Sequence, residues 1–181
     1  MSGVSEKYKF VFTGRWIPEK GESGQVYFSG KYWATDDFGI GFDYRPLVDD
    51  VSLTATYRLV SEDPSGWRPA VIVGTSEDDF TDNGEDVESR SYYLTLSKAL
   101  PDVELMGITP APYVGTVWIE ELEKFRALAG VSLRHEQATL IYQYSGTDSH
   151  LTLSRSINEN LSISAIYWGM KYPGLGMRFR F

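Results

Sequence analysis

Hydrophobic and polar residues alternate along most of the chain. In the first sixty residues, four runs at 8–17, 25–34, 38–45 and 51–59 place an apolar or aromatic residue at every second position. Successive side chains of a β-strand point to opposite faces, so each run predicts a strand with one apolar and one polar face. Each run is about nine residues long, which is the length that a tilted strand needs to cross a membrane.

The alternation continues at 67–75, 91–98, 103–109, 125–134, 137–144 and 150–154, and in two further runs after residue 160. About twelve strands without a domain boundary predict an all-β fold. We expect one closed antiparallel barrel over 8–181, preceded by a tail of residues 1–7. Residues 76–89 predict an acidic loop. Trp118 and Leu122 lie four apart, as do Glu120 and Lys124, which predicts a short helix inside a long loop at 110–124.

The two faces of the predicted strands favour a membrane barrel. The polar faces collect Gly, Ser, Thr and Arg, and the apolar faces carry aromatic residues near strand ends. A transmembrane barrel has a polar lumen and an apolar outer band with aromatic girdles, whereas a small soluble barrel has an apolar interior. With the N-terminus on the periplasmic side, the connections at 18–24, 76–89 and 110–124 become longer acidic extracellular loops. Those at 35–37, 99–102, 135–137 and 157–160 become short periplasmic turns. A soluble ligand-binding β-barrel is the alternative.

Composition excludes several functions. The chain of 181 residues has no cysteine, which excludes disulfides and thiolate chemistry, and its net charge of −8 argues against a nucleic-acid partner. No stretch approaches the roughly 20 apolar residues of a membrane helix. Residues 1–4 are not a signal peptide because they lack an apolar region, so we expect a mature form without its leader.

The final run, GLGMRFRF, has one apolar face. Its apolar residues, together with a glycine five positions before the last residue, resemble the assembly signal of bacterial outer-membrane barrels. The resemblance implies the outer membrane of a Gram-negative-type bacterium. It also implies the lipid bilayer, lipopolysaccharide and the outer-membrane assembly machinery as partners. The residues that carry it are Leu175, Gly176, Met177, Phe179 and Phe181.

Three further stretches carry a second resemblance. They are 68–74 (RPAVIVG) with 91–93 and 97–98, then 129–134 leading to 142–144, and last 160–162 through 174–177. Together they resemble the YjbH-type outer-membrane barrel family associated with bacterial exopolysaccharide. This chain is short, and an acidic segment replaces the family's glycine-rich aromatic loop after the RPA strand. The resemblance implies an envelope location and a connection with polysaccharide, and it supplies no catalytic residues.

The predicted lumen is basic. Its polar faces carry ten cationic residues against Asp43, Glu104 and Glu136. Charged rings select ions by sign, so an open lumen predicts a small passive channel for anionic solutes. Pairing of arginines with carboxylates would instead pack the lumen shut and leave an envelope scaffold. The ten residues are Lys9, Arg15, Lys31, Arg45, Arg58, Arg68, Arg126, Arg134, Arg178 and Arg180.

The predicted loops are acidic. Asp79, Thr81 and Asn83 resemble the start of a calcium-binding loop, but Arg90 stands where that loop requires a glutamate. These three residues are the metal candidate in the sequence. We nevertheless expect a solvated acidic rim and no cofactor, because acidic loops are commonly solvated.

Enzyme chemistry has little support in the sequence. His135 and His150 are the two histidines, and His150 shares a predicted face with Thr152 and Ser154. An outer-membrane hydrolase therefore stays an alternative. The close His-x-Ser arrangement of the outer-membrane phospholipase family is absent, since Leu151 and Thr152 follow His150. Without a phosphate loop, a nucleophile elbow or metal-ligand spacing, we expect no catalytic site.

Overall fold

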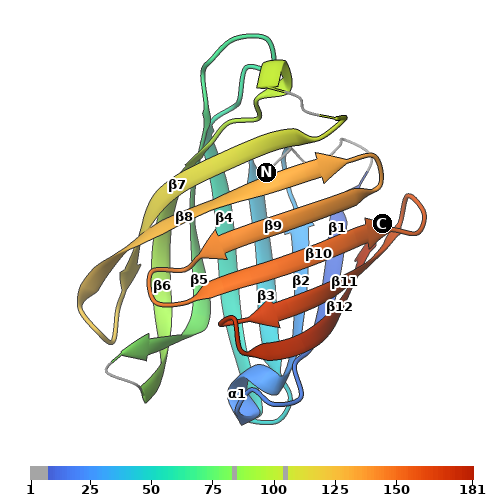
Figure 1. Ribbon diagram of the computed structural model, residues 1–181. Helices are drawn as coiled ribbons and strands as arrows, with labels where there is room; N and C mark the ends of the chain where they lie inside the picture. The colour runs from blue at the N-terminus through green and yellow to red at the C-terminus, as the bar shows by residue number, and fades with distance from the viewer. Residues whose placement is uncertain (1–7, 83–84, 104–105) are drawn as a thin grey trace.

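The computed structural model describes residues 8–82, 85–103 and 106–181 and shows a closed antiparallel barrel of twelve strands (Figure 1). Each strand pairs with the next one in sequence, and the last pairs with the first. The strands are β1 (Phe10–Trp16), β2 (Val26–Trp33), β3 (Phe38–Arg45), β4 (Asp50–Val60), β5 (Ala70–Asp82), β6 (Glu85–Ser97), β7 (Thr109–Ile119), β8 (Lys124–His135), β9 (Ala138–Tyr144), β10 (Ser149–Ser156), β11 (Leu161–Trp168) and β12 (Tyr172–Arg180).

The barrel closes between β1 and β12. Their register sets Phe12 opposite Phe179 and Gly14 opposite Met177. The backbone of Phe181 continues the pairing, since its N–H donates to Phe10 at 2.9 Å and its carbonyl accepts from the Phe10 N–H at 3.1 Å. The final apolar run is thus the strand that closes the barrel. Because the number of antiparallel strands is even, β1 begins and β12 ends at the same end of the barrel.

Polar side chains face the interior and apolar side chains face outward. Ser52, Ser97 and Ser162 are buried, whereas Leu53 is 70% exposed and Leu175 is 60% exposed. A soluble barrel would bury the leucines and expose the serines. The two faces therefore have the orientation that the alternation predicts, with hydroxyls and arginines inside.

The stretch at 103–124 differs from the prediction. The expected strand at 103–109 and helix at 116–124 are wrong. In their place are the short helix η1 (Pro101–Val103) and strand β7. Pro110 and Pro112 fit into β7 because their carbonyls accept from Leu100 and Lys98, beyond the end of β6. The prolines lack an N–H group, but they face residues 98–100, which follow the end of β6 and do not need that N–H to complete a strand ladder.

The acidic segment 76–89 is also not a loop. It extends β5 and β6 as a hairpin, in which Phe80 pairs with Val87 and Glu77 with Arg90. Connection lengths do not divide between the two ends as predicted. The connections 61–69 and 98–108 lie at the same end as the chain termini and are at least as long as 17–25 at the opposite end, and 61–69 rises above the barrel in Figure 1. The acidic stretches do gather at the opposite end, called here the far end.

Helical structure is limited to η1 and to α1 (Glu22–Gln25), which lies at the far end, at the bottom of Figure 1. No helix in the described part of the chain has the length and apolar character to span a membrane.

Candidate functional site

The barrel interior contains eight of the ten predicted lumen cations. Arg68 and Lys9 were expected in the lumen, and for these two residues the prediction is wrong. Arg68 lies in the β4–β5 connection, where it is exposed and its Nε donates to the Ser61 carbonyl at 3.2 Å, because β5 begins only at Ala70. Lys9 precedes β1 and is exposed at the rim. The inward-facing cations are Arg15, Lys31, Arg45, Arg58, Arg126, Arg134, Arg178 and Arg180.

Arg45 is neutralised at the far end. Its guanidinium lies 2.8 Å from Asp50, 3.8 Å from Glu77 and also contacts Glu88. The side chain is buried, so its charge is compensated within the wall. Arg58 is likewise paired, at 3.4 Å from Asp37. These two residues therefore add little positive potential to the lumen.

The three acids around Arg45 also form the one cluster among the described residues whose carboxylates are close enough to share a metal ion, with oxygen atoms within 4.8 Å of one another. Arg45 already occupies the space between them and supplies the cation. Of the predicted metal candidate, Asn83 and the side chains of Asp79 and Thr81 lie outside the described part of the chain.

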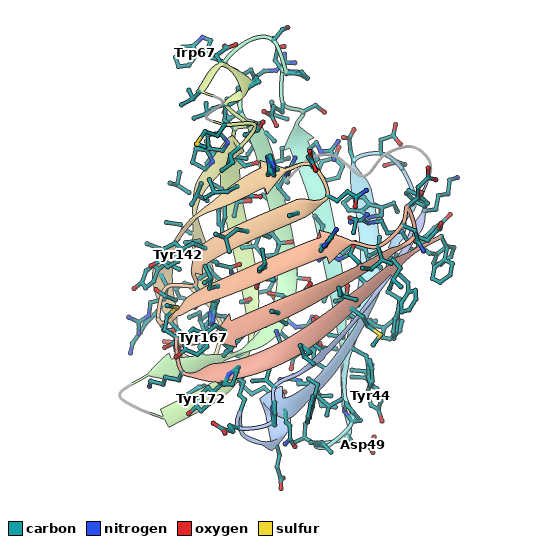
Figure 2. The ribbon with its side chains drawn as sticks, turned by 45° about the vertical axis from the view of Figure 1, so that its right-hand side comes forward. Tyr44, Asp49, Trp67, Tyr142, Tyr167 and Tyr172 are labelled. Carbon is teal, nitrogen blue, oxygen red and sulfur yellow. The ribbon has the colours of Figure 1, made fainter. Side chains whose placement is uncertain are left out.

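The connection at 61–69 is fastened to the near rim. Lys98 Nζ lies 3.2 Å from Glu62 and donates to the Asp63 carbonyl at 2.6 Å. The N–H of Gly66, and then the N–H and hydroxyl of Ser65, hold the pKa of the Asp63 carboxyl below its usual value. Trp67, 92% exposed, lies at the top of this connection (Figure 2).

Lys31 belongs to a hydrogen-bond chain across the wall. Its Nζ donates to the Thr56 hydroxyl at 2.8 Å, and that hydroxyl lies 3.1 Å from the Tyr93 hydroxyl. The chain spans β2 to β6 because Gly41 and Gly74 leave the intervening strands without side chains. Lys31 is thus held in place by the Thr56 hydroxyl, which the Tyr93 hydroxyl in turn contacts.

Arg178 and Arg180 differ from the other cations. They are consecutive inward residues of β12, and within the described residues neither makes an ion pair or a hydrogen bond through its side chain. The strand neighbours of Arg178 are Thr13 and Ser162, which carry hydroxyls and no charge. Arg178 is exposed although it faces inward. Arg180 is half-buried.

At the far end, aromatic rings enclose Arg15. Its guanidinium lies 4.3 Å from the Tyr27 ring centre and 4.2 Å from that of Trp168. The His150 ring packs on Trp168 with centroids 4.0 Å apart. Arg15 of β1 reaches Trp168 of β11 over the intervening strand β12, because Gly174 and Gly176 of β12 have no side chains in the way. Such cation–π contacts contribute about 0.5–2 kcal/mol each, so the stack rigidifies this mouth.

The β1–β2 connection folds against this stack. Ile17 is fully buried, and a Cβ added to Gly174 would meet it at 2.7 Å. Lys20 is buried as well, with Nζ 5.3 Å from the Trp168 ring centre. Across the barrel, Phe80 packs with Val117 and Ile119 in a buried apolar cluster. The far mouth is therefore narrowed from two sides.

Sequence reasoning missed the partner of His150, which is Ser145 in the turn before β10. His150 Nε2 lies 3.2 Å from the Ser145 Oγ, and its Nδ1 accepts the Gly169 N–H at 3.0 Å. Because Nδ1 accepts, the proton of the neutral ring is on Nε2, which therefore donates to the serine. A general base needs the opposite arrangement. This pair consequently holds the turn and does not activate Ser145.

The outer face carries an apolar band. Mid-strand positions such as Val114 and Met177 are exposed, and aromatics such as Phe10 and Trp16 lie near strand ends. Tyr142 and Tyr167 lie toward the ends of β9 and β11 (Figure 2). A groove of about 860 Å³ runs over β1–β6 between Phe12, Phe42 and Leu53. The outward-facing Arg90 and Arg155 lie near the ends of the barrel.

Comparison with protein-family models gave no match for this chain, and a search of curated proteins gave no significant match. The family resemblance stated from the sequence therefore has no support from these comparisons. What the structure establishes is a closed twelve-strand antiparallel β-barrel.

Proposed function

We propose that this barrel is an outer-membrane protein that acts as a small passive channel with a preference for anions. The observation that carries the proposal is the inverted distribution of side chains. Leu53, Val114 and Leu175 are more than half exposed on the outside, whereas serines, threonines and charged residues line the inside. A surface of this kind is stable in hydrocarbon, and an interior of this kind is stable around water.

The aromatic residues support the membrane setting. Phe10, Phe38 and Tyr57 mark the near end of the outer face, and Trp16, Tyr142 and Tyr167 mark the far end. Amphipathic rings at both boundaries of an apolar band are typical of membrane barrels. The apolar groove suits the acyl chains of a bilayer. The outer membrane is the bacterial membrane that contains such barrels, so we place the protein there, in contact with lipopolysaccharide and the assembly machinery.

The interior supports the anion preference. With strands about 4.8 Å apart and tilted by about 40°, a twelve-strand barrel has a radius of about 12 Å from its axis to the backbone. Glycines and small hydroxyl residues such as Gly41, Gly74 and Ser52 form part of that wall. Arg178 and Arg180 face it without a carboxylate partner among the contacts of the described residues, and Lys31 faces it with its Nζ on the Thr56 hydroxyl. Unpaired cations in an aqueous passage favour anions.

An envelope scaffold is the second candidate, because the far mouth is narrowed by the β1–β2 connection and by the Phe80 cluster. A link with exopolysaccharide rests on the sequence resemblance alone. The orientation of the His150–Ser145 pair does not favour the hydrolase, and the exposed apolar outer face does not favour a soluble ligand-binding barrel.

The proposal is tested with protein refolded in detergent. We expect heat-modifiable migration on SDS gels and, in planar bilayers, steps of conductance whose reversal potential in a salt gradient indicates anion preference. Arg178→Gln should weaken that preference, and Arg155→Gln on the outer face should not. A bilayer that stays silent would exclude the channel and favour the scaffold. A protein that stays soluble and monodisperse without detergent would exclude the membrane setting.

A further inference from the structure

Three cations that form no ion pair among the described residues make a ladder along one wall of the lumen, and the lowest of them, Arg15, stacks on Tyr27 and Trp168. In the register of β12 and β1, Arg180, Arg178 and Arg15 occupy three successive inward rows, opposite Val11, Thr13 and Gly176 respectively. Successive inward residues of a strand are about 6.7 Å apart, so the ladder extends over about 13 Å along the strands. Lys31 lies beside its upper row, because it pairs with Val11.

The ladder concentrates like charge without internal compensation. Arg178 and Arg180 are two residues apart on the same face of one strand, flanked by uncharged residues on both neighbouring strands at Arg178. Asp43 lies in the row of Arg178 but two strands beyond Thr13, and it acts electrostatically on Lys31. Charges in a protein interior are normally paired. An uncompensated row of cations is therefore stabilised by an anion from solution.

The spacing selects the kind of anion. A single small anion can contact one step of the ladder, whereas a linear molecule with two or more anionic groups can contact successive steps. Each additional contact then forms within one complex, at high effective concentration. Guanidinium groups bind phosphate and carboxylate oxygens through paired N–H donors, so the ladder suits both groups.

We propose that the β12–β1 wall binds linear oligoanions, with phosphate or carboxylate groups about 6–7 Å apart, along Arg180, Arg178 and Arg15. This inference rests on the proposed aqueous lumen and names the class of solute that enters it. The outward-facing Arg90 and Arg155 take no part, because they lie on the other side of the wall.

The experiment measures binding by calorimetry on the refolded protein at low salt, with inorganic tripolyphosphate, orthophosphate, adipate and acetate as probes. We expect tripolyphosphate to bind at least about tenfold more tightly than orthophosphate, and adipate to bind more tightly than acetate. Binding by tripolyphosphate but not by adipate would restrict the class to phosphates. Raising the salt concentration should weaken every one of these interactions.

Arg178→Gln is the decisive variant, and it should weaken tripolyphosphate binding about tenfold or more, since it removes a charge-assisted contact. Folding is not at risk, because Arg178 makes no hydrogen bond or ion pair through its side chain within the part of the chain that the structure describes, and its removal relieves repulsion from Arg180. Arg155→Gln on the outer face and Arg134→Gln on the opposite wall are matched controls that should leave the affinity unchanged.

Equal affinities for tripolyphosphate and orthophosphate, or equal losses in Arg178→Gln and Arg134→Gln, would overturn the inference. The bilayer experiment separates the two proposals. A conducting protein without preferential oligoanion binding retains the channel and loses the ladder. A silent protein that binds tripolyphosphate through Arg178 retains the ladder and loses the channel.

Discussion

Replacing Val114 by arginine tests whether the outer face contacts lipid. Val114 is the central residue of β7, is 58% exposed and pairs with Leu96 and Ala129 on the outer face. In water an arginine at so exposed a position would stay hydrated and change stability by less than about 0.5 kcal/mol. In the middle of a bilayer it should cost about 2–4 kcal/mol. A cost of about 2–4 kcal/mol corresponds to about a thirtyfold to thousandfold change in the folding equilibrium constant.

The assay is equilibrium unfolding by urea in lipid vesicles, followed by tryptophan fluorescence and by the folded band on unheated gels. The control is Thr95→Arg, because Thr95 pairs with Gly115, the next residue of β7, and faces the lumen. We expect a loss for Thr95→Arg of at most about 1 kcal/mol, since lumen substitutions are tolerated. A loss for Val114→Arg no larger than that of Thr95→Arg would refute the assignment of the two faces.

Three further outcomes are expected. Trp168→Ala should lower the free energy of unfolding by about 3 kcal/mol, since it removes the ring between Arg15 and His150, while Trp67→Ala should be neutral in the same denaturant titration. Gly174→Ala should cost about 1–3 kcal/mol because its Cβ meets Ile17, whereas a Cβ at Gly21 meets nothing within 4 Å and Gly21→Ala should keep the wild-type unfolding midpoint. Because the folded pKa of Asp63 is depressed, its contribution is present above the unfolded pKa of about 3.9 and is lost as the pH falls through the folded value. The protection factors of amides in the 61–69 connection, which are exchange rates corrected for the intrinsic effect of pH, should therefore fall only in acid, and protection factors that stay constant with pH would contradict this.

The alternation of apolar and polar residues was sufficient to predict the closed antiparallel barrel and which face of most strands points inward, and the expected count of about twelve agrees although β7 takes the place of the strand expected at 103–109. The run at 38–45, for example, coincides with β3. This works because a strand's side-chain period is fixed at two, so the sequence alone assigns residues to faces. Which cations would be paired was not predictable, since Arg45 meets Glu77 of β5 and Glu88 of β6, which lie more than thirty residues away along the chain.

The errors occurred where local composition imitated another structure. Glu120 and Lys124 lie four apart, as on a helix, because they flank the turn between β7 and β8. The acidic residues of 76–89 suggested a loop, although Phe80 and Val87 alternate with them as a paired hairpin requires. The contact of Arg15 with Trp168 escaped prediction because the two side chains meet across Gly174 and Gly176 of β12, and the packing of His150 on Trp168 escaped it because the two residues lie on different strands.

The pairing of β1 with β12 also has a consequence for biogenesis. Every other strand pair joins neighbours along the chain and can form as soon as both are made, but this one must wait until the whole ribbon has curled around. Until then two bare edges stay open to other polypeptides, which is the condition that leads to aggregation. An assembly factor that covers the free edge of β1 or β12 during insertion would therefore act on the β1–β12 junction before any other part of the molecule.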